Sequence, residues 1–583
     1  MTVASSNRRK ARWAVVLLTV IVGVPTACTL DLAGQPPGGT GGSTSASTAS
    51  TTSTSAGTSG STSATTSGSS GTGGAAPLCV PGEMSSCYGG PMGTENQGVC
   101  KSGMHACQPD GMSYGACANQ VLPSAENCLK PADEDCDGKA LACTGDTQKS
   151  GSLGVAANDD VIFAVATDLS GNVFVGGVSG ATPPAGASFT MQNGSGAVVQ
   201  FKKDGTKGWS AQLSTSVVGG YSVVRGLATD KQGNVFVVGE FQGTTSGGTI
   251  SVVGAGGIDI FLAKLDPSGK TLWAKPFGIA ADQSGYGVAV DPAGNVIITG
   301  RAVGAVDFGG GVPVPTPSGG NNVFVARFDT NGNHLWSKTF GDDGDQTAYS
   351  VATTPAGDVV LAGELTGIID FGGITVASAG GVDVFVAKLA GGSGAPMWAH
   401  AYGDDTHDQS ASGVAVGSDS SVVITGSMVG KCNFGGANLD AKNSLNVFVA
   451  KLHPDGSHDW SHDYGSDMDR QVATGVAVDP AQNILVVGYF GGDLSFADMA
   501  TTLHGTDLTS FTTDIFVAKL AADGKGVWAR SFGDLSDQTA WAVTADPVSN
   551  VVFGGTYQGT VNLMPPTLTS SGNYDALWAQ LAP

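Results

Sequence analysis

A fourteen-residue unit that recurs seven times constrains the fold of this chain more than any other feature. Its clearest copy is GVAVDPAGNVIITG, residues 287–300, in which two apolar runs flank a turn. Asp291 can accept backbone N–H bonds, Pro292 presets φ, and Gly294 is free to take a positive φ. The unit therefore predicts a β-hairpin. The other copies span residues 164–177, 226–239, 350–363, 413–426, 475–488 and 542–555.

Each hairpin is followed by a Gly-rich link, an apolar strand of the form D-x-F-V-A-K-L, and a strand led by tryptophan. The tryptophans are Trp209, Trp273, Trp336, Trp398, Trp460 and Trp528, separated by 64, 63, 62, 62 and 68 residues. Because they recur in every period, we expect them in the core rather than in a sugar site. Four strands in each period of about sixty residues are typical of a β-propeller. We predict an all-β fold, with a seven-bladed propeller over residues 144–583.

The two ends of the repeat region predict how the ring closes. Seven D-x-F-V-A-K-L strands are present, but only six Trp strands follow them. The segment Lys149–Gly154, ahead of the first hairpin, aligns with the tail of a Trp strand. We therefore predict that this segment forms the outer strand of the last blade, which removes an exposed sheet edge.

The repeat resembles the SBBP-type β-propeller repeat. Residues 273–327 match its pattern of W-x-K-x-F-G, then G-V-A-V-D-x-x-G-N-V, then D-x-F-V-x-K at nearly every position. The resemblance spans most of residues 144–583 and implies the propeller architecture. It carries no shared catalytic residues, so it implies no activity.

The N-terminal region is organised for export. Residues 1–27 contain basic residues before a short apolar run, as in a signal peptide, and resemble a bacterial lipoprotein signal that ends at Cys28. That resemblance implies lipidation of Cys28; ordinary secretion with an unmodified Cys28 is the alternative. Residues 28–77 are rich in Gly, Ser and Thr and predict a flexible linker. We expect an outer-membrane lipoprotein or cell-surface protein, with a periplasmic or secreted location as the alternative.

Residues 78–143 form a cysteine-rich segment that we interpret as a disulfide module, since so short a segment buries little core. The absence of a C-x-x-C pair makes a zinc site the poorer interpretation. Spacing alone leaves the pairing open. The cysteines are Cys79, Cys87, Cys100, Cys107, Cys117, Cys128, Cys136 and Cys143.

Part of this segment, DEDCDG at residues 133–138, resembles the Asp-rich motif of the myxobacterial MopE-like family of metal-binding proteins. The resemblance implies that Glu126, Asp133, Asp135 and Asp137 are oxygen ligands, and their chemistry suits Ca²⁺. A solvated acidic loop without an ion is the alternative. No other cofactor is expected.

Acidic residues also recur in the loops that lead into the inner strands. If the V-A-V run is the innermost strand, they surround one mouth of the central channel. One interpretation is an acidic ring that attracts Ca²⁺ or a cationic ligand; the other is that each carboxylate caps its own loop by accepting backbone N–H bonds. The residues are Asp160, Asp282, Asp345, Asp408, Asp469 and Asp537.

The formal net charge of −22 argues against nucleic-acid binding, which needs clustered Lys and Arg. We predict a monomeric binding or scaffold protein for a protein or glycan ligand, attached to a membrane through Cys28, and not an enzyme. A propeller hydrolase or lyase acting on an extracellular polymer is one alternative, and it needs a non-recurring cluster of carboxylate, His, Tyr or Arg at the channel mouth. A metal-binding role for the cysteine-rich segment is another.

Overall fold

The computed structural model shows two units, which divide between Pro123 and Ser124. The following residues are described: 79–91, 93–123, 133, 136, 144–154, 158–181, 193–215, 220–245, 248–315, 320–466, 470–496, 499, 502–506, 512–563, 567–571 and 573–583. The predicted leader, lipidation site Cys28 and linker lie outside them. All regular structure in the described part of the chain is β-structure, and no helix there has the length and apolarity that a membrane crossing requires.

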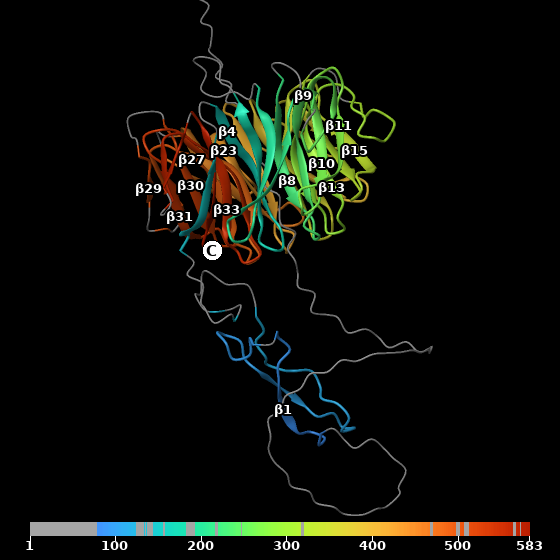
Figure 1. Cartoon of the computed structure of the whole chain (residues 1–583), viewed down its shortest axis with the longest axis vertical. Helices are drawn as coiled ribbons and strands as arrows, with labels where there is room; N and C mark the ends of the chain where they lie inside the picture. Colours follow the sequence, from blue (N-terminus) through green and yellow to red (C-terminus); the bar gives the residue numbers. More distant parts are fainter. Residues whose placement is uncertain are drawn as a thin grey trace, which may run out of the picture. The chain divides into compact units, whose positions relative to one another are not determined.

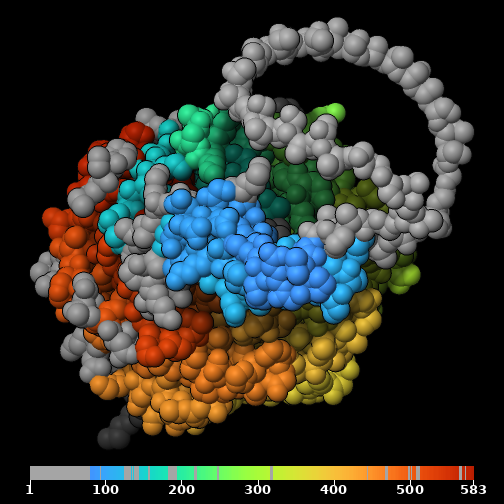
Figure 2. All heavy atoms as spheres, turned by 90° about the horizontal axis from the view of Figure 1, so that it is seen from below, coloured from blue at the N-terminus to red at the C-terminus, as the bar shows by residue number. Residues whose placement is uncertain are grey.

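The larger unit is a ring of seven four-stranded antiparallel sheets within the described residues, as predicted. Figure 2 shows the colours passing around the ring in chain order, from teal through green, yellow and orange to red. The first strand of each sheet contacts the first strands of its two neighbours, so these strands form the inner wall. They are β4 (Asp159–Thr167), β8 (Ser222–Thr229), β12 (Gln283–Val290), β16 (Gln346–Thr353), β22 (Gln409–Val416), β26 (Gln471–Val478) and β32 (Gln538–Ala545).

The second and third strands of each blade carry the rest of the repeat. The second strands are β5 (Val173–Ala181), β9 (Val235–Thr244), β13 (Val296–Ala302), β17 (Val359–Leu365), β23 (Val422–Cys432), β27 (Ile484–Phe490) and β33 (Val551–Tyr557). The third strands are β6 (Ser195–Phe201), β10 (Val253–Leu265), β14 (Asn322–Phe328), β20 (Asp383–Leu389), β24 (Leu439–Leu452), β30 (Asp514–Leu520) and β36 (Asp575–Leu581).

The outer strands complete the sheets, and short hairpins extend the links of three blades. The outer strands are β7 (Lys207–Leu213), β11 (Thr271–Phe277), β15 (His334–Phe340), β21 (Pro396–Tyr402), β25 (His458–Tyr464), β31 (Gly526–Phe532) and β3 (Thr147–Leu153). The hairpins are β18 (Ile368–Asp370) with β19 (Thr375–Ala377), β28 (Asp493–Ser495) with β29 (Thr502–His504), and β34 (Thr560–Asn562) with β35 (Thr567–Thr569).

The ring closes by the predicted exchange of strands. β3 pairs antiparallel with β36, and Ser150 lies opposite Ala579 in that pairing. The seventh blade therefore has the order β3-β36-β33-β32 and is built from both ends of the repeat region. Figure 1 shows teal β4 beside dark red β33, where blade 1 meets blade 7. Closure gives β36 a hydrogen-bonded strand on each side, β3 and β33, and brings the inner strand β32 of blade 7 against β4 of blade 1.

The hairpin turns follow the chemistry expected from the sequence. Asp291 Oδ1 accepts the backbone N–H groups of Ala293 and Asn295, both at 2.9 Å, and Gly294 has a φ of 85°. The Asn295 amide donates to Asp291 Oδ2 at 2.9 Å, which closes the turn from the other side. The same Asp–Asn brace is present at Asp168, Asp230, Asp479 and Asp546.

The space between neighbouring blades holds seven apolar cores, one at each junction. The recurring tryptophans belong to these junctions, as predicted, and their indole N–H groups donate to backbone carbonyls of the next blade. Trp336 donates to Gly391 at 2.7 Å, and Trp528 donates to the carbonyl of Pro583, the last residue of the sequence, at 3.1 Å. Each tryptophan thus ties its outer strand to the following blade.

The smaller unit contains β1 (Met84–Cys87) paired antiparallel with β2 (Gly103–Ala106). Disulfides join Cys79 to Cys107 and Cys87 to Cys117. Cys100 and, in the larger unit, Cys136 are also disulfide-bonded, whereas Cys128 and Cys143 lie outside the described residues. The predicted disulfide-rich region is therefore confirmed. Disulfides persist in oxidising compartments, so these bridges favour a location outside the cytoplasm.

Candidate functional site

The predicted acidic residues lie where the loops enter the inner strands, and they brace neighbouring blades. Asp282, Asp345 and Asp408 each accept, through Oδ1, a backbone N–H of the preceding blade at 3.0 Å, from Ile258 within β10 and from Asn321 and Val382 directly before β14 and β20. Asp537 does the same at 3.2 Å, and Asp160 accepts the N–H of Gly180 at 3.0 Å. Asp469 lies outside the described residues. The described carboxylates accept backbone N–H groups, but from other segments of the chain and not from their own loops.

The metal-ligand prediction falls mostly on residues whose placement is not described. Asp133 is described and 9% exposed, and its carbonyl is 3.6 Å from Cys136 Sγ. Glu126, Asp135 and Asp137 lie outside the described residues. Within the described ranges, no three His, Cys, Asp or Glu side chains gather closely enough to hold an ion.

Every inner strand carries a β-bulge at one fixed place in the repeat. The register against the second strand shifts there, so one extra residue is inserted. A bulge redirects the side chain of its extra residue. This position does not repeat its residue type. From blade 1 to blade 7 it holds Phe163, Arg225, Tyr286, Tyr349, Ser412, Thr474 and Trp541.

Five of these bulge residues contact one another in sequence across blade boundaries. The rings of Trp541 and Phe163 are 6.0 Å apart, and the Arg225 guanidinium lies 4.9 Å from the Phe163 centroid and 5.9 Å from that of Tyr286. Tyr286 and Tyr349 follow at 5.6 Å. We call these five residues the inner belt. It covers the inner wall from blade 7 through blade 1 to blade 4.

The remaining two blades present small hydroxyl groups at the bulge. Ser412 Oγ donates to the carbonyl of Ala473 at 2.7 Å, and Thr474 Oγ1 donates to that of Ala540 at 2.7 Å. Both hydroxyls are thus used in bonds to the next blade. The inner wall is therefore bulky and aromatic on one side and small on the other.

Charged side chains on the second strands accompany the inner belt. Glu240 on β9 accepts from the Arg225 guanidinium at 2.6 Å, and both side chains are 4% exposed. Glu364 on β17 accepts from Tyr349 Oη at 2.6 Å and from Ser410 Oγ at 2.8 Å. Arg301 on β13 lies 6.0 Å from the Tyr286 centroid. Arg301 and Glu364 keep part of their surface accessible, unlike Arg225 and Glu240.

The two glutamates have opposite acidities. Burial alone would raise the pKa of Glu240, but Arg225, Ser284 and Arg301 outweigh it and hold the pKa below its ordinary value. For Glu364, burial dominates over the hydrogen bonds from Tyr349 and Ser410, and its pKa is raised. One carboxylate thus stays ionised while the other retains its proton to higher pH, the arrangement that separates base from acid in many sites.

Sequence reasoning did not identify this cluster, although it named such a cluster as the mark of an enzyme. The variation at the bulge position is visible once the seven copies are aligned on their Gln and Gly residues. The bulge itself is not visible, because an extra residue in a strand depends on pairing with its neighbour. The aligned variation was the available signal.

Comparisons with known proteins support the repeat architecture and no specific activity. No family model matches the sequence. An uncharacterised WD repeat-containing protein of Acanthamoeba polyphaga mimivirus is 25% identical over 194 residues, which are 28% of this chain and 14% of the relative. The regulatory protein FlaEY of Caulobacter vibrioides is 26% identical over 370 residues, 58% of this chain and 37% of the relative. The chain thus spans well under half the length of either relative.

Two solved structures are similar to the chain only at low TM-scores. Virginiamycin B lyase from Staphylococcus aureus has a TM-score of 0.37 and 7% identity, and covers 74% of this chain and 99% of its own. Quinohemoprotein alcohol dehydrogenase from Comamonas testosteroni has a TM-score of 0.36 and 11% identity, and covers 75% and 76%. At these values the blade count rests on the chain's own sheet topology, which defines a seven-bladed β-propeller repeat protein.

Proposed function

We propose that this protein is an exported binding protein whose propeller holds a glycan at the inner belt and the charged residues beside it. The observation that carries the proposal is that the bulge position, and the second-strand position that holds Glu240, Arg301 and Glu364, do not repeat their residue types. A residue needed to build a blade recurs in every blade, whereas residues that bind one ligand belong to one site. The buried Arg225–Glu240 pair, with both side chains 4% exposed, lies beside the accessible Arg301 and Glu364 and supports them.

The accessible groups match the chemistry of sugars. Trp541 and Tyr489 keep part of their rings exposed and lie 6.5 Å apart, which provides apolar surface with a polar edge. Arg301 and Glu364 provide planar donors and acceptors for hydroxyl groups. A concave site that combines aromatic faces with a few convergent polar groups is the usual form of a small-molecule site.

The test is a binding screen of the full mature chain, by biolayer interferometry, against extracellular polysaccharides and against solubilised surface proteins. We expect binding to at least one polysaccharide, lost in the Glu364→Ala variant and retained in Ser412→Ala. Binding to proteins alone, or polysaccharide binding that both variants retain, would contradict the proposal.

A second candidate function is hydrolysis or elimination on the same glycan, and the opposite acidities of Glu240 and Glu364 favour it. In this candidate Glu364 holds the proton that a leaving oxygen needs. Release of new reducing ends by the wild type but not by Glu364→Gln would support it. Binding without any release of reducing ends would leave the protein as a binding module.

The proposal also includes export and a lipid anchor on Cys28. It further includes the assignment of the repeat to the SBBP type. Metabolic labelling with palmitate should modify the wild type and not Cys28→Ser. We also propose Ca²⁺ binding by the MopE-like segment with Glu126, Asp133, Asp135 and Asp137. Metal analysis of the full chain before and after chelation tests it, and no bound metal at micromolar concentration would end it.

A further inference from the structure

The junction between blades 7 and 1 is packed differently from the other junctions. One position on the third strand points its side chain toward the preceding blade and is buried in the shared core. In blades 2 to 7 it holds Phe261, Phe324, Phe385, Phe448, Phe516 and Leu577. Blade 1 has Ala197 at this position. A benzyl group is therefore missing on the blade 1 side of the junction.

On the blade 7 side of the same junction one position is also small, although Trp578 two residues later is larger than the Leu or Val of blades 2 to 6. The residue before the phenylalanine position points toward the following blade, and in blades 2 to 6 it is β-branched: Ile260, Val323, Val384, Val447 and Ile515. Blade 7 has Ala576 instead, which belongs to the core shared with blade 1. Two small residues thus face this junction where other junctions have Phe and a β-branched residue.

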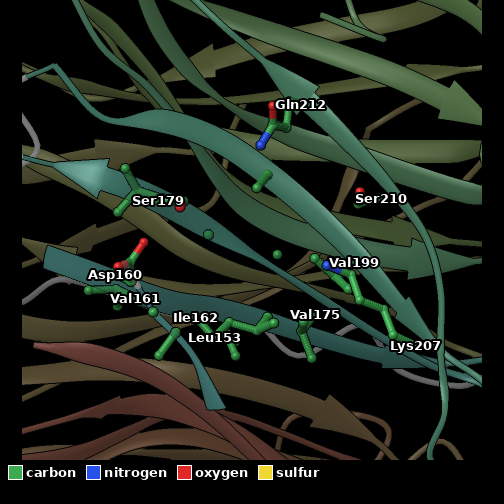
Figure 3. Close-up of a pocket in the computed structure, with 16 residues that line it drawn as sticks. Leu153, Asp160, Val161, Ile162, Val175, Ser179, Val199, Lys207, Ser210 and Gln212 are labelled. Atoms are coloured by element: carbon green, nitrogen blue, oxygen red, sulfur yellow. The ribbon is translucent and has the colours of Figure 1, made fainter. Parts of the chain in front are cut away.

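A cavity of about 230 Å³ lies at this junction, and both Ala197 and Ala576 line it. Figure 3 shows Ile162, Val175 and Leu153 along one wall and Val199 across from them. Ile162, Val175 and Val199 are buried. The space exceeds the roughly 150 Å³ of a dry apolar cavity that suffices to bind benzene.

The opening of the cavity has a different chemistry from its floor. Lys207, Ser210 and Gln212 are all exposed, all lie on the outer strand β7, and all offer hydrogen-bond donors. In Figure 3 the Lys207 side chain reaches toward the cavity. The acidic residue of the lining, Asp160, lies deeper, is 2% exposed and accepts the N–H of Gly180. The opening is therefore cationic and the floor mainly apolar.

We propose that this cavity binds a small organic acid, with its apolar body between blades 7 and 1 and its carboxylate on Lys207. The site is separate from the inner belt and does not depend on the function proposed for it. Binding here would join blade 1 to the blade that closes the ring, and so would stabilise the closed state by mass action.

The test uses octanoate as the probe with the full mature chain, measured by titration calorimetry. 1-Octanol and octylamine share its body and differ in the head group. We expect the order octanoate, then octanol, then octylamine. Ala197→Phe, which restores the residue type of five other blades, should weaken octanoate binding by at least about tenfold. Lys207→Gln should weaken octanoate and leave octanol unchanged, whereas Lys203→Gln should change neither.

One further variant keeps the test decisive. If Ala197→Phe does not fold, Ala576→Ile fills the same space from blade 7 and should weaken binding in the same way. Absence of binding by the wild type, or octanoate binding that is unchanged in Lys207→Gln and in the filling variants, would overturn the proposal and leave the cavity as a packing defect.

Discussion

The same repeat forms the cores between blades and the inner wall of the ring, but residue types repeat in the cores and vary on the inner wall. Between blades, the phenylalanine and tryptophan positions hold nearly the same residues in each copy, because every blade must cover the next one. On the inner wall, the bulge position holds Arg, Tyr, Trp, Phe, Ser or Thr. The difference separates residues that every blade needs from residues that vary between blades, to which we assign the proposed ligand.

The largest effect should come from removing closure. Deletion of residues 144–154 removes β3 and exposes the edge of β36, whose strand pairing β3 provides. We expect loss of a cooperative thermal transition and aggregation, measured by calorimetry and light scattering. Deletion of residues 28–77, the Gly-, Ser- and Thr-rich segment, is the control and should leave the transition intact.

Next is the loss of one recurring core residue. Phe385→Ala should lower the free energy of unfolding by about 3–5 kcal/mol, because removing the buried phenyl group leaves a cavity in the core between blades 3 and 4. Chemical denaturation measures it. A milder inner-belt change, Tyr349→Phe, removes only the hydroxyl group that donates to Glu364 and should cost far less. Equal losses would erase the distinction between the two regions.

The buried ion pair offers a sharper comparison within the inner wall. Glu240→Leu leaves Arg225 charged and buried and should cost about 3–5 kcal/mol of unfolding free energy. The double variant with Arg225→Met should recover most of this loss, because two apolar residues need no partner. A double variant that remains as unstable as the single one would show that the pair is part of the framework.

The smallest expected effect is a change in pH dependence. Because burial raises the pKa of Glu364, the folded state holds this proton more tightly than the unfolded chain. The stability it contributes is complete below the ordinary pKa of glutamate and is lost as the pH rises through the folded pKa. Melting temperature should therefore fall more with rising pH in the wild type than in Glu364→Gln. Parallel profiles would refute the assignment.

The recurring features were predictable from sequence and the exceptional ones were not. The hairpins, the blade count and the closing strand follow from a period that turn residues such as Asp291 and Gly294 mark locally. The inner belt depends on a bulge, and the Arg225–Glu240 pair joins neighbouring strands, so neither is encoded in a local pattern. The cavity was signalled only by the loose copies SGAVVQF and DALWAQL, whose small residues face each other only once the ring has closed.

The central claim is that the inner wall recognises a ligand through positions that the repeat does not need. It is tested most directly by titrating the bound polysaccharide against Arg301→Ala and Ser427→Ala, which change the same position of the repeat in blades 3 and 5. We predict that Arg301→Ala weakens binding by at least about tenfold, with melting temperature preserved, while Ser427→Ala binds like the wild type. Unchanged affinity in Arg301→Ala, or equal loss in both variants, would contradict the account.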